Sequence, residues 1–129
     1  MKFALIAALA LAPLSAVAQD VTGNWRSQPG ETGAYVTVQM GPCSNDANQR
    51  CGQITGVFEG DGSPGNQEIV GRPIIWGMQP AGAGSWDNGT IWAPDQDKTY
   101  SSKMDLSGNN LSVSGCVLFI CRSQTWTRI

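Results

Sequence analysis

The last stretch of the chain, residues 115–128, constrains the fold more than any other. It contains two of the four cysteines, Cys116 and Cys121, with an apolar turn between them. Beyond Cys121 the side chains alternate with a period of two, which is typical of a half-buried strand, because successive residues of a strand point to opposite faces. One face would carry Arg122, Gln124, Trp126 and Arg128. We interpret this run as the strand that closes a small β-barrel.

The first 18 residues have the features of a secretory signal peptide. Lys2 supplies the positive end, residues 3–14 form an apolar run, and residues 16–18 are a small-x-small cleavage site. The apolar run is too short for a membrane-spanning helix. We therefore predict a signal peptide over residues 1–18, cleaved near Ala18, and a single exported domain over residues 19–129. The location would be a bacterial periplasm or the medium.

The composition of the exported part favours strands and limits the choice of partners. Its net charge is −3 once Lys2 is removed from the total of −2, and it has no run of lysines or arginines. Nucleic acids and anionic lipid surfaces are therefore poor candidates as partners. Glycine, serine, threonine, asparagine and valine are frequent, and no apolar pattern of helical period exceeds about two turns. These features predict an all-β domain, which we expect to be a monomer.

The four cysteines form two local pairs, Cys43 with Cys51 and Cys116 with Cys121. An even count in an exported chain indicates disulfides, although four cysteines allow three pairings. We favour the two local bonds, each of which would stabilise the domain by about 2–3 kcal/mol. The alternative is a four-thiolate zinc site, whose usual cysteine spacing is shorter than that between Cys43 and Cys51.

Alternating runs and turn signals recur along the whole exported chain. The clearest pair is residues 35–40 and 53–59, a predicted hairpin whose polar loop has a cysteine at each foot. Counting similar runs gives about eight strands at spacings of roughly 8 to 15 residues. That pattern predicts a small antiparallel, mostly up-and-down eight-stranded barrel with two local disulfides.

Gly23-x-Trp25, together with an arginine on the final strand, resembles the lipocalin and fatty-acid-binding-protein superfamily. In that superfamily a tryptophan on the first strand packs under an arginine from the last strand at the closed end of the barrel. A guanidinium over an indole face is a favourable cation–π pair. The resemblance implies a lipocalin-like barrel in which Arg122 or Arg128 contacts Trp25. Both arginines lie on one face of the predicted strand, so parity leaves the choice open.

A closer resemblance covers nearly the whole exported chain. The chain is similar to an uncharacterised family of small exported bacterial proteins, known as a domain of unknown function. The matching blocks are residues 23–25, 51–54, 71–73, 75–77, 86–91, 97–100 and 115–128. The chain departs from the family pattern at Trp92, usually tyrosine, at Ala93, often acidic, and at Asp97, often glycine. The resemblance implies ligand binding and transfers no catalytic residue.

The residues offer little for catalysis. Histidine is absent, which removes the commonest general base and metal ligand, and no nucleophile elbow or phosphate-binding loop is present. The acidic candidates for a carboxylate pair or a calcium site lie among turn residues, where capping is their usual role. They are Glu59, Asp61, Asp95 and Asp97. We therefore predict a protein that is not an enzyme and has neither cofactor nor metal.

The five tryptophans, a high number for a chain of this size, are more informative than the acidic residues. They would either fill a short barrel completely or leave some rings around a small cavity, and an eight-stranded barrel permits both arrangements. Because glycine-rich loops adjoin them, we predict that Trp76, Met78 and Trp92 line a ligand-binding opening. The predicted function is non-catalytic binding of a small, partly apolar ligand or cell-envelope component. The alternative is a structural or protein-interaction module of the envelope with a fully packed barrel.

Overall fold

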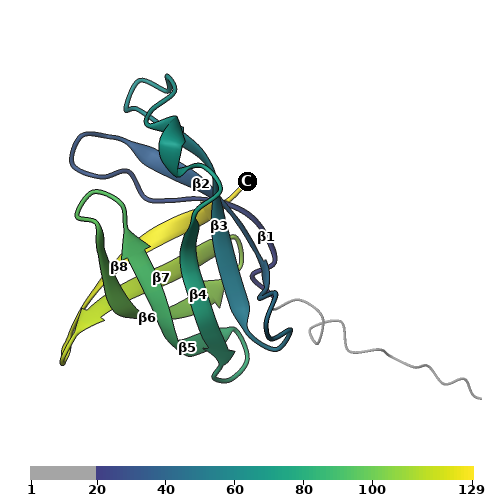
Figure 1. Ribbon diagram of the computed structural model, residues 1–129. Helices are drawn as coiled ribbons and strands as arrows, with labels where there is room; N and C mark the ends of the chain where they lie inside the picture. The colour runs from purple at the N-terminus through teal and green to yellow at the C-terminus, as the bar shows by residue number, and fades with distance from the viewer. Residues whose placement is uncertain (1–19) are drawn as a thin grey trace, which may run out of the picture.

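In the computed structural model, which describes residues 20–129, eight antiparallel strands form a closed barrel in which sequence neighbours pair throughout (Figure 1). The strands are β1 (Gly23–Arg26), β2 (Tyr35–Pro42), β3 (Arg50–Phe58), β4 (Pro73–Pro80), β5 (Ser85–Ala93), β6 (Lys98–Ser107), β7 (Asn110–Val117) and β8 (Ile120–Arg128), with a short 3-10 helix, η2 (Gln67–Ile69), before β4. The predicted all-β, up-and-down eight-stranded barrel is confirmed. The predicted signal peptide, residues 1–18, lies outside the described residues.

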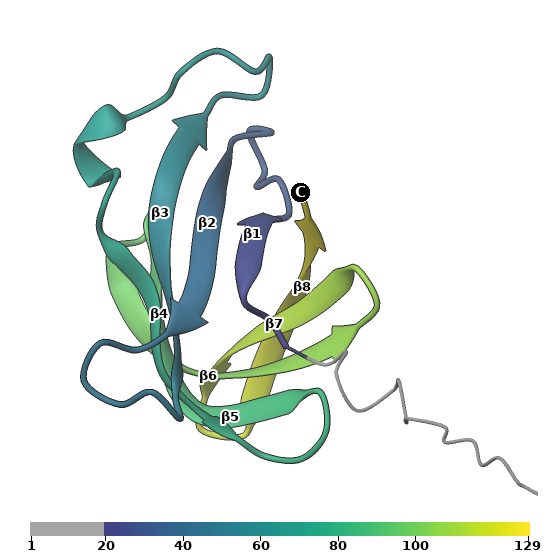
Figure 2. The ribbon, with the colours of Figure 1, turned by 90° about the vertical axis from the view of Figure 1, so that its right-hand side faces the viewer.

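The two ends of the chain close the barrel. Strand β1 pairs with β8 through Trp25↔Arg128 and Arg26↔Thr127, and Figure 2 shows these two strands side by side. Both termini of the barrel lie at one end, which we call the closed end, together with the β2–β3, β4–β5 and β6–β7 connections. The other four connections lie at the opposite end, because successive strands of an up-and-down barrel reverse direction.

The segment before β1 covers the closed end. Val21 is fully buried in the core, and its carbonyl accepts a hydrogen bond of 2.8 Å from the indole nitrogen of Trp25. Arg128 lies over the same indole ring and donates to the carbonyls of Asp20 and Thr22. The structure therefore places Arg128 on Trp25, whereas Arg122 lies exposed near the opposite end of β8.

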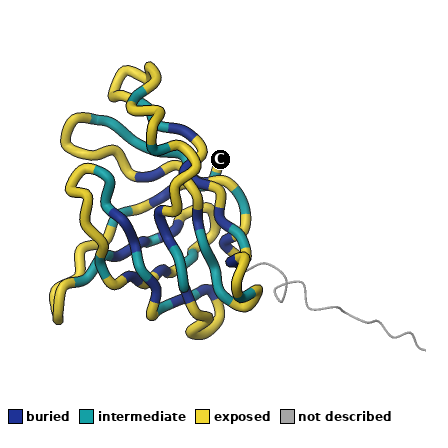
Figure 3. Tube along the Cα trace, in the orientation of Figure 1, coloured by how far each residue is buried: buried dark blue, intermediate teal, exposed yellow. Residues whose placement is uncertain are grey.

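The interior of the barrel is filled by large side chains, as the buried positions along the strands in Figure 3 indicate. Four of the five tryptophans are buried, and Trp76 is half-buried. Glycines on the inner face make room for methionines. A Cβ at Gly52 would lie 2.5 Å from the sulfur of Met40, and one at Gly89 would lie 2.5 Å from the sulfur of Met78. The tryptophans thus serve mainly to fill the barrel.

Both predicted disulfides are present. Cys43–Cys51 links the two ends of the β2–β3 connection, and Cys116–Cys121 staples the end of the β7–β8 hairpin. No cysteine in residues 20–129 is free. The four-thiolate zinc alternative is therefore wrong.

Candidate ligand-binding groove

A hollow of about 670 Å³ lies on the barrel wall over β2, β3 and β4. It is open to solvent and is not an enclosed cavity inside the barrel. Its apolar lining residues are Met40, Pro42, Pro73, Ile75 and Trp76, and its polar ones are Thr22, Gln39, Ser44, Asn45 and Gln53. No charged side chain lines this groove. The surface is therefore suited to a neutral, partly apolar molecule.

The groove forms where the sheet is least regular. Strands β3 and β4 are joined by only three residue pairs, Arg50↔Met78, Gly52↔Ile75 and Gln53↔Pro73, and the register shifts between each pair and the next. Such shifts bend a strand and interrupt its ladder of hydrogen bonds. Because Gly52 has no side chain, the buried side chains of Met40 and Ile75 come close beneath it. These two residues form the floor of the groove, and Trp76 contributes to its wall.

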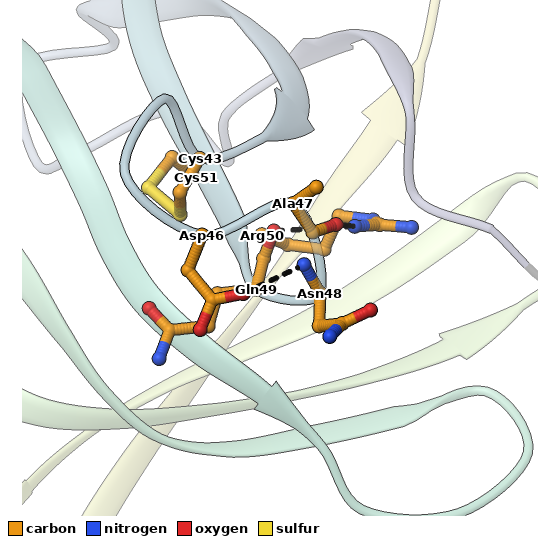
Figure 4. The surroundings of a disulfide bond; sticks show 7 residues. All are labelled: Cys43, Asp46, Ala47, Asn48, Gln49, Arg50 and Cys51. Carbon is orange, nitrogen blue, oxygen red and sulfur yellow. Dashed lines mark hydrogen bonds between the residues drawn. A yellow bond between two sulfur atoms is a disulfide. The ribbon is translucent and has the colours of Figure 1, made fainter.

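The loop of residues 43–51, at the closed end, forms another wall through Ser44 and Asn45. Figure 4 shows how the loop is held. The disulfide joins its two feet, the backbone N–H of Asn48 donates to the Asp46 carboxylate over 2.9 Å, and the Arg50 guanidinium donates to the Ala47 carbonyl over 3.0 Å. A wall fixed before binding reduces the entropy that a ligand must overcome.

An ion pair connects this loop to the segment before β1. The Nε of Arg50 lies 3.1 Å from a carboxylate oxygen of Asp20. Partial burial acts to raise the pKa of Asp20, but hydrogen bonds from Thr22 and Arg50 outweigh it and hold the pKa below its ordinary value. The pair thereby keeps Thr22, which lines the groove, next to the disulfide loop.

Of the three predicted ligand-binding residues, the structure places Trp76 at the groove, but not Met78 or Trp92. Trp76 and Met78 would share a face in a regular strand. However, Gly77 between them has a φ of +70°, which breaks the alternation, and Met78 is fully buried in the core. The prediction treated the Trp76-Gly77-Met78 run as a plain strand and overlooked the left-handed conformation that glycine permits.

Trp92 belongs to a separate cluster at the opposite end of the barrel. The Arg72 guanidinium lies 3.7 Å from the centroid of the Trp92 ring, and the indole nitrogen donates to the Asp97 carboxylate over 2.9 Å. Asp97 has a φ of +51°, a conformation that favours glycine, the residue frequent here in the similar family. Two of the three departures from the family pattern, Trp92 and Asp97, thus contact each other.

The acidic loop residues act within turns. Asp61 accepts hydrogen bonds from the backbone and the hydroxyl of Ser63, and these bonds lower the pKa of the Asp61 carboxyl. Among residues 20–129, no group of three or more His, Cys, Asp or Glu side chains could hold a metal ion. In the same range, no helix is long and apolar enough to cross a membrane.

The polar part of the groove was not predicted from the sequence. Gln39 and Gln53 face each other across β2 and β3, and Gln39 lies on the polar face expected for the 35–40 run. A second hollow of about 420 Å³, on β5, β6 and β7, was not anticipated either. Its lining includes Asp87, Thr90, Ser101 and Lys103 but no aromatic side chain. The groove over β2–β4 is therefore the stronger candidate for a partly apolar ligand.

Comparison with known proteins agrees with this architecture. Residues 23–128 match the family described as "Uncharacterized protein conserved in bacteria (DUF2147)". The chain belongs to this family. No curated protein sequence matches it. Among solved structures, it is similar to protein HP1028 of Helicobacter pylori, described as belonging to the lipocalin family, with a TM-score of 0.68 and 15% sequence identity over 87% of this chain and 84% of the other. At that identity the similarity concerns the fold, which is lipocalin-like.

Proposed function

We propose that this member of the DUF2147 family is an exported, monomeric, non-catalytic protein that binds a small, partly apolar molecule in the groove over β2–β4. One observation carries the proposal. The groove combines the half-buried ring of Trp76 with the side-chain amides of Gln39 and Gln53 and lacks charged lining residues. Its volume of about 670 Å³ lies within the range of roughly 300–1,000 Å³ typical of small-molecule sites.

The chemistry of the lining defines the ligand class. Trp76, Ile75 and Pro73 provide apolar contacts, while Gln53 and Asn45 provide both donors and acceptors. A neutral molecule with an apolar portion and a few hydroxyl or amide groups fits this combination. A cell-envelope component of that kind is within reach of an exported protein. The lipocalin-like fold is compatible with binding of a small ligand. The proposed site is on the barrel wall and not in the barrel interior, which is filled by side chains.

The filled interior favours a second candidate, a structural or interaction module of the envelope. Trp25, Met40, Met78 and Trp126 occupy the core, so this module would engage a partner with its outer surface. The two candidates differ in what accompanies the protein when it is isolated. A small molecule should accompany a binding protein, and a second polypeptide should accompany an interaction module.

Native mass spectrometry of the protein purified from its own cells distinguishes them. We expect a small-molecule adduct on the wild type that is lost in Trp76→Ala and retained in Val70→Ala, a control at an exposed apolar residue outside the groove. In titrations with the neutral apolar dye N-phenyl-1-naphthylamine, the wild type and the control variant should bind the dye with similar affinity, and Trp76→Ala should bind it more weakly. A bare mass, no dye binding and a co-purified partner chain would overturn the proposal in favour of the second candidate.

A further inference from the structure

The end of the β7–β8 hairpin exposes four consecutive apolar residues, which we call the apolar tip. The exposed fractions are 55% for Val117, 90% for Leu118, 99% for Phe119 and 71% for Ile120. Within the described range, 20–129, the other large exposed apolar residues are Val70 and Ile129, and each is isolated. Isolated exposed apolar residues are ordinary, whereas a contiguous group usually marks an interaction site.

The backbone presents the tip as a rigid projection. Strands β7 and β8 stay paired up to Val117↔Ile120, and the disulfide Cys116–Cys121 lies directly behind this pair. Figure 1 shows the yellow-green hairpin extending away from the body of the barrel. The side chains are thus held in water at the end of a disulfide-bonded hairpin, where no other part of residues 20–129 covers them.

The turn contains one residue, Leu118, whose backbone conformation is unfavourable for its side chain. Leu118 has a φ of +55°, in a region that glycine and asparagine adopt readily and bulky side chains rarely adopt. A hairpin selected only for folding would have glycine or asparagine there. Instead, the two most exposed positions hold leucine and phenylalanine. Backbone strain kept at an exposed site is a reason to look for a function of the side chain.

The shape and charge of the tip indicate its partner. It is convex, and four side chains offer much less than the roughly 800 Å² per partner of a stable protein interface. A lipid bilayer, by contrast, requires no complementary surface. Residues 106–129 contain no Asp or Glu, and Arg122 is exposed just behind the tip, where its guanidinium can reach lipid headgroups while its stem stays apolar. The hairpin itself therefore brings no carboxylate to the membrane when its tip inserts.

We propose that the apolar tip inserts into the interfacial region of a lipid bilayer and holds the barrel reversibly at a membrane surface. The hydrophobic effect drives this insertion, because the exported chain is acidic and has no basic cluster that could bind lipid headgroups. Membrane binding should therefore be insensitive to salt, unlike binding by a basic patch. A single myristoyl chain alone gives only marginal, reversible attachment, and four side chains give a similarly weak one. The tip and the groove involve different strands, so each can be tested alone.

Flotation with vesicles of phosphatidylethanolamine and phosphatidylcholine tests this proposal. We expect the wild type to float with the vesicles at low and high salt, and the double variant Leu118→Ser/Phe119→Ser to reduce the bound fraction at least tenfold. Ile129→Ser removes an apolar residue of similar exposure at the closed end and should bind like the wild type. Near-ultraviolet circular dichroism verifies that each variant is folded.

A single-residue probe provides an independent measurement. In Phe119→Trp, the indole should be quenched by brominated lipids in the vesicles. Absence of vesicle binding by the wild type would overturn the proposal, as would undiminished binding by the double variant. Self-association that disappears in the double variant, without any vesicle binding, would assign the tip to contact with a second copy instead.

Discussion

The guanidinium of Arg128 lies over the indole of Trp25, with its central carbon 4.4 Å from the ring centroid. The two residues are also direct partners across β1 and β8. In addition, the guanidinium donates to the carbonyls of Thr22 and Asp20, each over 3.1 Å. One side chain therefore connects the last strand, the first strand and the segment that covers the closed end. Because Trp25 is fully buried, the cation–π contact is shielded from water on the ring side and is stronger for it.

Replacing Arg128 with alanine should lower the free energy of unfolding by about 2 kcal/mol, from the lost cation–π contact and two hydrogen bonds. Urea denaturation measures this loss. Arg128→Lys should recover only part of it, because an ammonium group lacks the fork that reaches both carbonyls. The matched control is Arg122→Ala on the same strand, expected to stay within about 0.5 kcal/mol of the wild type. Equal losses for both arginines would contradict this role of Arg128.

The contact between Arg128 and Trp25 also requires glycine at position 23. Its φ is +138°, and a Cβ there would lie 2.9 Å from Nη1 of Arg128. Gly23→Ala combines backbone strain with displacement of the guanidinium and should reduce the free energy of unfolding by about 1–3 kcal/mol. Gly41→Ala is the control, because a Cβ at Gly41 has no neighbour within 4 Å. If both substitutions have the same small effect in urea denaturation, the close approach at Gly23 is not a constraint.

Removing each disulfide in turn should distinguish an effect on stability from an effect on ligand binding. Cys43→Ala/Cys51→Ala and Cys116→Ala/Cys121→Ala each open a short loop, and each should lower the free energy of unfolding by about 2–3 kcal/mol in the chain-entropy model. Only the first pair borders the groove, so only its removal should weaken binding of N-phenyl-1-naphthylamine. Urea denaturation and dye titration of both variants measure the two effects. Equal dye affinity in the two variants would mean that the loop does not form a wall of the site.

Most of the fold was predictable because its determinants are local. Alternation marks each strand, and a mainly up-and-down barrel pairs each strand with its sequence neighbour, so the order of strands is also their order in space. Likewise, the cysteines pair across single connections. The choice between Arg122 and Arg128 was not local. It depends on the register of β1 against β8, which strand parity does not determine.

The candidate site was less predictable, because it depends on departures from regular structure. The groove exists where β3 and β4 shift register twice and where Gly77 adopts a positive φ, which separates Trp76 from Met78. Trp92 is covered by Arg72, a contact between residues far apart in sequence. The apolar turn between Cys116 and Cys121 was evident in the sequence, but its exposure follows only from where the hairpin projects.

Asp20 should make stability depend on pH in the acidic range. Its pKa is lowered in the folded protein, so its contribution is complete above the unfolded value of about 3.9 and is lost as the pH falls through the folded value. Because its side chain is 48% exposed, Asp20→Asn should cost less than about 1 kcal/mol at pH 7. The difference from the wild type should shrink as the pH is lowered from about 5 toward 2.

Urea denaturation across that pH range tests the effect. Glu31→Gln, an exposed carboxylate in the β1–β2 connection, serves as the control and should differ little from the wild type at any pH. A gap between Asp20→Asn and the wild type that stays constant down to pH 2 would show that the aspartate acts through shape or hydrogen bonding, and not through its charge.

Leu118 offers a test in which stability and function should move in opposite directions. Its φ of +55° costs about 1–2 kcal/mol for a residue with a branched side chain, and asparagine tolerates this region much better. The side chain is 90% exposed, so replacing it loses little packing. Leu118→Asn should therefore raise the free energy of unfolding by about 1 kcal/mol while reducing vesicle binding. Phe119→Asn, at the neighbouring exposed position without a positive φ, should reduce vesicle binding with no gain in stability. A Leu118→Asn variant that is no more stable than the wild type would mean that the turn is not strained, and the hairpin would then offer no evidence that leucine is kept there for an interaction.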